Sequence, residues 1–169
     1  YRYDPLLGWS NIPDARGTFS RTEFSYELNI NSLGLRGAEI TMEKPAGTRR
    51  IAVLGDSFVW GIGAAEPELF TTLLADSLPA TQVLNFGVAG YSPIQHHLLT
   101  DKVLALDPDL VIISFCLGND FADAHARADP EHGGQAKRQA ASAGQHIILC
   151  LALGLAVYRD RIQGRFLRA

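Results

Sequence analysis

The pattern of polar and apolar residues predicts a small hairpin near the start of the chain. From Glu23 to Ile30 polar and apolar residues alternate strictly, which is the pattern of a strand with one buried face. We expect this strand to pair with residues near Thr18–Ser20. Residues 1–20 are rich in turn-forming and aromatic residues, and Trp9 is expected to pack this arm on the main body.

Three apolar runs further along predict the strands of a buried sheet. They are residues 51–54, which follow a pair of arginines, residues 82–86 and residues 110–116. Such continuous runs are typical of parallel strands that are covered on both faces. Between them, helices are predicted from near Pro67 and over about residues 93–106. Their apolar stripes are Leu69, Phe70, Leu73, Leu74 and Leu78, and Ile94, Leu98, Leu99, Val103 and Leu106. This order of elements predicts a parallel sheet with covering helices.

Each predicted strand ends in a polar turn that contains glycine. Gly-Asp-Ser at 55–57 follows the first strand, residues 87–92 follow the second, and Gly-Asn-Asp at 118–120 follows the third. Because the carboxyl ends of parallel strands lie at one edge of a sheet, we expect these turns to come together. Ser57 considered alone fits either a nucleophile or a helix N-cap. Three such turns at one edge favour a functional role for Ser57.

These turns carry groups that serine-dependent ester hydrolysis needs. That reaction requires a nucleophile, a base to take its proton, and donors aimed at the developing oxyanion. Ser57 can supply the nucleophile and one backbone N–H, Gly90 a second N–H, and Asn119 a side-chain amide. Considered singly, Gly90 also fits a plain turn glycine, and Asn119 a turn or a helix cap. The predicted catalytic residues are therefore Ser57, Gly90 and Asn119.

The segment from residue 49 to about residue 123 resembles the SGNH-hydrolase superfamily, also called GDSL-type esterases and lipases. The resemblance rests on three blocks in the family's order and spacing: Gly-Asp-Ser, Asn-Phe-Gly-Val-Ala-Gly at 85–90, and Gly-Asn-Asp. The arm sequences at residues 4–9 and 31–36 also resemble those of bacterial members that carry an N-terminal extension.

The resemblance implies a fold and a set of roles. The fold is a flavodoxin-like three-layer α/β/α sandwich with a parallel sheet, here expected to lack its last strands. Ser57 is implied as the nucleophile, with the Ser57 N–H, Gly90 and Asn119 forming the oxyanion hole. The implied reaction is hydrolysis of a carboxylic ester through an acyl-Ser57 intermediate, without a metal or a cofactor. The implied substrate is a small-molecule or carbohydrate ester, and acyl transfer to a carbohydrate is an alternative.

The catalytic base is where this sequence departs from the family. The family takes its base from an Asp-x-x-His block near the end of the domain, and here the only such pattern is Asp129–His132. An extended linker could span about 30 Å from the third turn, but no predicted strand or helix intervenes to hold the imidazole. His132 is therefore expected in a solvated loop, and His96 and His97 in surface or packing roles. The chain is interpreted as incomplete or altered near residue 125, which makes a catalytically impaired fragment a further alternative.

The last part of the chain differs in charge and pattern. Residues 1–124 contain 8 Lys/Arg against 15 Asp/Glu, whereas residues 125–169 contain 7 against 3. The apolar run at 146–157 is expected to form a helix, either buried or in need of a partner. The predicted organisation is an arm at 1–48, an α/β core at 49–124 and an atypical basic tail with an apolar helix at 125–169.

Composition excludes some classes of partner. The net charge of −3 gives no reason to expect nucleic acid or an anionic membrane surface as a partner. No stretch approaches the roughly 20 apolar residues that span a bilayer. Cys116 and Cys150 lie in apolar runs and are expected to be buried rather than to form a disulfide or a metal site. Compartment and oligomeric state stay open.

Overall fold

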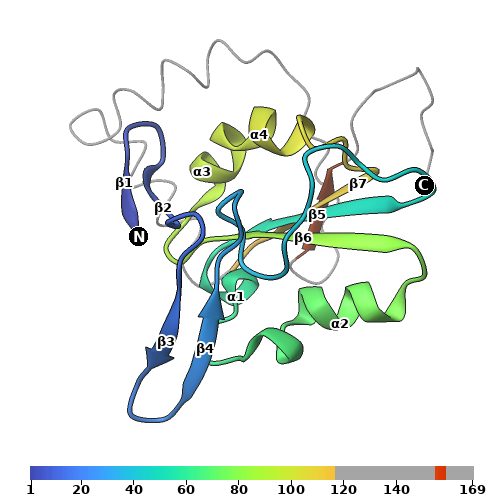
Figure 1. Ribbon diagram of the computed structural model, residues 1–169. Helices are drawn as coiled ribbons and strands as arrows, with labels where there is room; N and C mark the ends of the chain where they lie inside the picture. Colours follow the sequence, from blue (N-terminus) through green and yellow to red (C-terminus); the bar gives the residue numbers. More distant parts are fainter. Residues whose placement is uncertain (117–154, 159–169) are drawn as a thin grey trace.

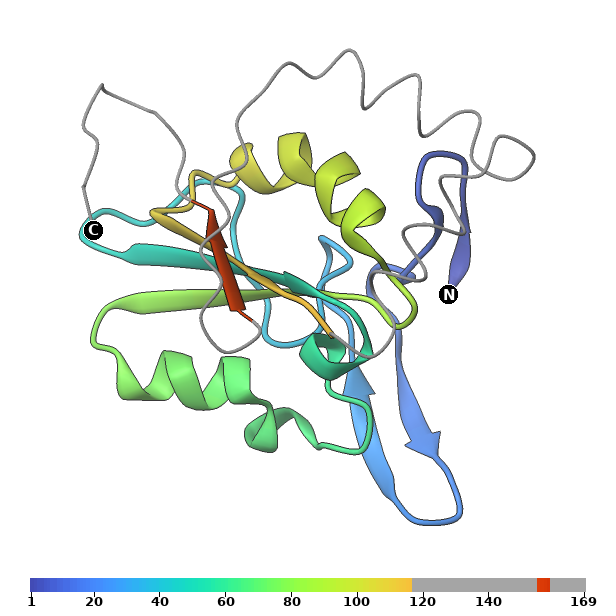
Figure 2. The ribbon, with the colours of Figure 1, turned by 180° about the vertical axis from the view of Figure 1, so that it is seen from behind.

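The computed structural model describes residues 1–116 and 155–158, and Figures 1 and 2 show it from opposite sides. Its strands are β1 (Arg2–Asp4), β2 (Gly8–Ser10), β3 (Arg16–Ser20), β4 (Ser25–Asn29), β5 (Arg49–Gly55), β6 (Thr81–Gly87), β7 (Leu110–Ser114) and β8 (Leu155–Tyr158). Its helices are α1 (Ser57–Trp60), the short 3₁₀ helix η1 (Glu66–Glu68), α2 (Phe70–Ser77), α3 (Pro93–Leu98) and α4 (Thr100–Leu104). The predicted hairpin is confirmed, because β3 and β4 pair antiparallel.

The centre of the molecule is a sheet with the strand order β6-β5-β7-β8. As predicted, β5 runs parallel to both β6 and β7. Gly55 pairs with Gly87, and Leu54 pairs with Ile113. The three parallel strands therefore end level with one another, at a single edge of the sheet.

The fourth strand of the sheet corrects one prediction. For residues 155–157 the expected helix is wrong, because they belong to β8, which pairs antiparallel with β7. An apolar run of this kind does not distinguish a buried helix from a strand by its periodicity. Without β8, the outer edge of β7 would leave backbone groups unpaired, and pairing them favours the strand. The rest of the run, 146–154, lies outside the described residues.

Both faces of the sheet are covered by helices, which confirms the α/β class (Figure 1). On one face the strand residues Ala52, Leu54, Leu84, Phe86 and Val111 share a core with Leu99, Val103 and Leu106 of the α3–α4 segment. On the other face Ile51 and Val53 pack with Val59 of α1. Successive strand residues thus point into different layers, so the strands have to be apolar throughout.

The helix predicted near Pro67 forms, but its buried face differs from the predicted stripe. Leu69 is buried, whereas Phe70 and Leu73 are 44% and 55% exposed. Thr71 is buried in their place and accepts a hydrogen bond from Asn85 Nδ2 at 3.3 Å. The apolar side chains of α2 are therefore not all used by the core.

The helix predicted over residues 93–106 is divided at Leu99 into α3 and α4. It starts as its sequence suggests, with Ser92 as N-cap and proline in the first turn. Ser92 Oγ donates to Gln95 Oε1 at 2.6 Å, and the Ser92 N–H donates to the same oxygen at 3.0 Å. This closed cap fixes the point at which the chain leaves the turn after β6.

Arg50 connects the linker before β5 to the core at the amino-terminal end of the parallel strands. Its side chain is fully buried, although the sequence places it among the residues that precede the first strand. Its guanidinium donates to the Thr41, Met42 and Leu106 carbonyls at 3.0, 3.0 and 2.7 Å. Burial lowers the pKa of Arg50 from its ordinary value.

Candidate active site

Ser57 lies at the sharp turn between β5 and α1. It is the first residue of α1, and Asp56 is the N-cap, because Asp56 Oδ1 accepts a hydrogen bond from the Phe58 N–H at 2.9 Å. The capping role considered for Ser57 therefore belongs to Asp56. Ser57 itself is half-buried, which leaves it accessible to a substrate at the end of the strand.

Two glycines let α1 pack close against the sheet. A Cβ on Gly55 would lie 2.2 Å from Val59 Cγ2, and a Cβ on Gly87 would lie 2.2 Å from the Trp60 nitrogen. Asn85 fixes this contact, because its Nδ2 donates to the Val59 carbonyl at 2.8 Å and its Oδ1 accepts from the Gly87 N–H at 2.9 Å. The second sequence block thus positions the helix that begins with Ser57.

The turn after β6 brings Gly90 to the same edge as Ser57. Gly55 and Gly87 are paired, and the Val88 N–H donates to the Gly55 carbonyl at 3.2 Å. Gly90 is exposed and has a φ of +80°, in the left-handed region that favours glycine. Two of the three predicted catalytic residues therefore follow adjacent strand ends.

The N-terminal arm covers the Gly90 turn. Trp9 Nε1 donates to the Ala89 carbonyl at 3.1 Å, and the Tyr91 hydroxyl donates to the Trp9 carbonyl at 2.5 Å. The Trp9 and Tyr91 rings are 5.9 Å apart, and a Cβ on Gly90 would lie 3.2 Å from Trp9 Cζ2. Burial raises the pKa of Tyr91 above its ordinary value. Sequence reasoning predicted that Trp9 packs on the body but did not identify the turn that it contacts.

The third predicted residue, Asn119, lies outside the described residues, as do Asp129 and His132. The strand that leads toward Asn119 is β7, which ends at Ser114 beside β5. Cys116, two residues later, is half-buried rather than buried.

His96 is a buried histidine near the end of β5. It is 2% exposed, and its ring centroid lies 6.2 Å from that of Phe115. In the described part of the chain neither ring nitrogen has a hydrogen-bond partner. Burial lowers the pKa of His96 to about 4. A buried imidazole with this pKa is a weak base at neutral pH, so the packing role expected for His96 is the one that the structure supports.

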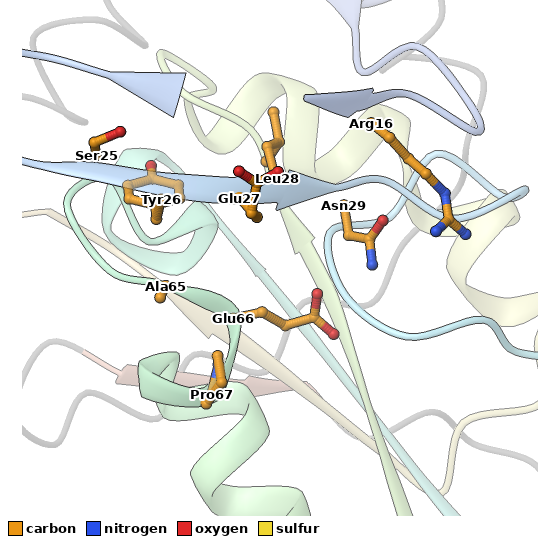
Figure 3. Close-up of a pocket in the computed structure, with 9 residues that line it drawn as sticks. All are labelled: Arg16, Ser25, Tyr26, Glu27, Leu28, Asn29, Ala65, Glu66 and Pro67. Atoms are coloured by element: carbon orange, nitrogen blue, oxygen red, sulfur yellow. The ribbon is translucent and has the colours of Figure 1, made fainter. Parts of the chain in front are cut away.

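Two cavities lie at the surface near these elements. One has a volume of about 430 Å³ and is lined by Ser57, Phe58, Gly61, Ile62, Ala64, Glu68, Leu69 and Phe70. The other has a volume of about 510 Å³ and lies between β4 and the segment 65–67 (Figure 3). Its described lining includes Arg16, Tyr26 and Glu66 and neither Ser57 nor Gly90. The smaller cavity is therefore the one that adjoins the candidate site.

Comparison with known proteins supports the sequence resemblance. A model of the GDSL-like Lipase/Acylhydrolase family matches residues 53–167, which is more than half of the chain. No curated protein sequence matches the chain.

Within the described ranges, no group of three His, Cys, Asp or Glu residues is placed to hold a metal ion. The helices described there are also too short or too polar to cross a bilayer.

Proposed function

The chain belongs to the GDSL-like lipase/acylhydrolase family, and we propose that it hydrolyses carboxylic esters with Ser57 as the nucleophile. The observation that carries this proposal is the position of Ser57. It begins α1 immediately after a central parallel strand, and the Gly90 turn follows the neighbouring strand. In parallel sheets this edge is where ligands and catalytic groups collect.

In the proposed reaction Ser57 Oγ attacks the ester carbonyl carbon while a base accepts the hydroxyl proton. The resulting tetrahedral oxyanion collapses, the bond to the leaving oxygen breaks, and the alcohol departs with a proton. Water then attacks the acyl-Ser57 ester and releases the carboxylic acid. Asp56 contributes by capping α1, which holds the backbone on either side of Ser57 in place.

We propose that the oxyanion is bound by the Ser57 N–H, the Gly90 N–H and the Asn119 side-chain amide. Loss of one such donor typically lowers kcat about 100- to 1000-fold. Asn119→Ala is therefore expected to lower kcat for an ester by a factor in this range and to leave the thermal midpoint within a few degrees. Unchanged kinetics in Asn119→Ala would remove Asn119 from the oxyanion hole.

For the base, His132 with Asp129 is the candidate that the sequence offers, and a catalytically impaired chain is the alternative. The burial of His96 and its low pKa argue against His96 in this role. His132→Ala tests the first alternative, because loss of Ser57-dependent turnover identifies His132 as the base. Retention of the full rate would show that the base is another group.

The proposal is tested by turnover of p-nitrophenyl butyrate by the purified chain and by two serine variants. Ser57→Ala is expected to lower kcat at least 10⁴-fold, whereas Ser77→Ala, at the exposed end of α2, keeps the parent rate. Equal rates in the parent chain and Ser57→Ala would contradict the proposal. The same assay with an added sugar tests the acyltransferase alternative, because transfer yields an acylated sugar instead of the free acid.

A further inference from the structure

We propose that the cavity beside Ser57 binds the acyl part of the substrate, and that this part is an apolar chain longer than acetyl. The inference rests on the proposed function, because it assigns the cavity to the group that Ser57 would carry. The cavity volume is about 430 Å³, many times the roughly 30 Å³ that one water molecule occupies in the liquid. An acetyl group alone would leave most of this space unfilled.

Three of the described residues that line the cavity have large apolar side chains that are exposed. Phe58, Ile62 and Phe70 line it, and they are 71%, 47% and 44% exposed. Large apolar side chains that gather at one surface site indicate a binding surface. The cavity accounts for the unexpected exposure of Phe70 on α2, because Phe70 lines it.

The lining offers little to a charged or sugar-like group. Among the described residues that line it, only Glu68 is ionisable, and Glu68 Oε2 accepts a hydrogen bond from the Ala65 N–H at 2.9 Å. That carboxylate therefore serves to cap η1. An apolar chain is the group that matches the remaining lining.

The wall of the cavity is held in place before any ligand binds. Arg36, which is 3% exposed, donates to the Trp60, Gly61 and Ala64 carbonyls at 2.7, 2.6 and 2.6 Å. Its guanidinium also lies over the Trp60 ring at 4.4 Å. A chain entering this site meets a preformed surface, which lowers the entropy cost of binding.

The test compares p-nitrophenyl acetate, butyrate and octanoate below their critical micelle concentrations. Full burial of one methylene raises kcat/KM about fourfold, so a chain that is half covered gains about twofold in kcat/KM per methylene. The six added methylenes from acetate to octanoate should therefore raise kcat/KM about 60-fold. Phe70→Ser is expected to lower the octanoate-to-acetate ratio of kcat/KM about tenfold. Leu73→Ser is the matched control, because Leu73 lies one turn further along α2, is also exposed and does not line the cavity.

The outcomes separate this inference from the proposed function. Ser57-dependent turnover with no preference for chain length, or a preference that Phe70→Ser leaves unchanged, overturns the cavity assignment alone. If no ester is turned over in a Ser57-dependent way, the proposed function fails. The cavity is then judged by titrating Ser57→Ala with methyl octanoate and methyl acetate. The cavity assignment is supported if methyl octanoate shifts the NMR signals of Ile62 and Phe70 more than methyl acetate does. Equal shifts overturn it.

A different observation carries a second inference: we infer that Trp9 is a positioning residue for Gly90. Two hydrogen bonds between the arm and the turn flank Gly90, because Trp9 Nε1 donates to the Ala89 carbonyl and the Tyr91 hydroxyl donates to the Trp9 carbonyl. The indole ring also lies against Gly90. The arm also approaches the cap of α3, where Gln95 Nε2 donates to the Leu7 carbonyl at 3.5 Å. An exposed glycine that has to place its N–H toward an oxyanion needs such support to be held in one geometry.

Trp9→Phe tests this inference, because it keeps an aromatic ring and removes the N–H that binds Ala89. It is expected to lower kcat about tenfold with KM changed less than twofold, since the oxyanion forms only after the substrate binds. Lys102→Met is the control, because it removes another bond between arm and core, from Lys102 Nζ to the Leu33 carbonyl at 3.1 Å. Hydrogen exchange at the Gly90 amide gives a readout independent of turnover and is expected to speed up about tenfold in Trp9→Phe only.

An equal loss of kcat in Lys102→Met would show that Trp9 acts only through the stability of the arm, and would overturn the inference. Unchanged exchange at Gly90 in Trp9→Phe would also overturn it. Because exchange is measured on the folded chain without substrate, this outcome is informative even if the proposed esterase activity fails.

Discussion

At the scale of single residues, His96 couples the stability of the fold to pH. Burial lowers the pKa of His96 to about 4, whereas an unfolded chain has a histidine pKa of about 6.5. Above pH 6.5 the imidazole is neutral in both states and carries no penalty. Between pH 6.5 and 4 only the unfolded state binds the proton, so the free energy of unfolding falls as the pH falls through this window.

Urea unfolding at pH 7.5 and pH 5.0 measures this effect. His96 is expected to account for about 2 kcal/mol of the stability that the parent chain loses between these pH values. His96→Leu removes the titrating group and should lose less stability by about that amount. Equal losses in the two proteins would show that His96 does not titrate as its burial indicates.

Single residues also show what sequence reasoning could find. The positions of Ser57 and Gly90 after adjacent strand ends are confirmed, because each follows an apolar run in a glycine-containing turn, a signal that is local in sequence. Their catalytic roles stay predictions. The burial of Arg50 was missed, because arginine is rarely fully buried and nothing nearby in the sequence predicts it. Its Leu106 carbonyl partner is brought to it only by the completed fold.

At the scale of elements, the packing of α1 against β6 sets the position of Ser57. Gly87→Ala is expected to push α1 away, because the added Cβ would lie 2.2 Å from the Trp60 backbone nitrogen. Such overpacking lowers the free energy of unfolding by about 1–3 kcal/mol. Displacement of the turn between β5 and α1, which carries Ser57, should lower kcat for an ester more than tenfold. Gly17→Ala in β3 is the control, since its Cβ meets no atom within 4 Å. Thermal melts and kcat for both variants test this, and a Gly87→Ala protein with parent values would contradict it.

The elements differ in how well their sequences predict them. The parallel strands were predicted correctly because both of their faces are buried, which forces a continuous apolar run. The exposure of Phe70 was not predicted, because an apolar stripe has the same appearance whether it faces a core or a cavity. The strand formed by residues 155–157 was not predicted either, because its backbone partner is the edge of β7 and not a nearby segment.

At the scale of the whole molecule, side-chain hydrogen bonds join the arm to the α/β core. Trp9 contacts the Gly90 turn, and Arg36 binds the loop that follows α1. The two contacts reach two different loops at the same end of the sheet as Ser57. The sequence predicted that the arm packs on the body, but the partners of these side chains are set by long-range packing and could not be read from local patterns.

The central claim is that Ser57 is the nucleophile of an ester hydrolase. Its most direct test is intact-mass and peptide analysis of the folded chain after incubation with a fluorophosphonate probe, in which the nucleophile bonds to phosphorus as fluoride leaves. We predict one adduct per chain, located on Ser57 and absent from Ser57→Ala. A folded chain that stays unlabelled, or that is labelled equally in Ser57→Ala, would contradict the account.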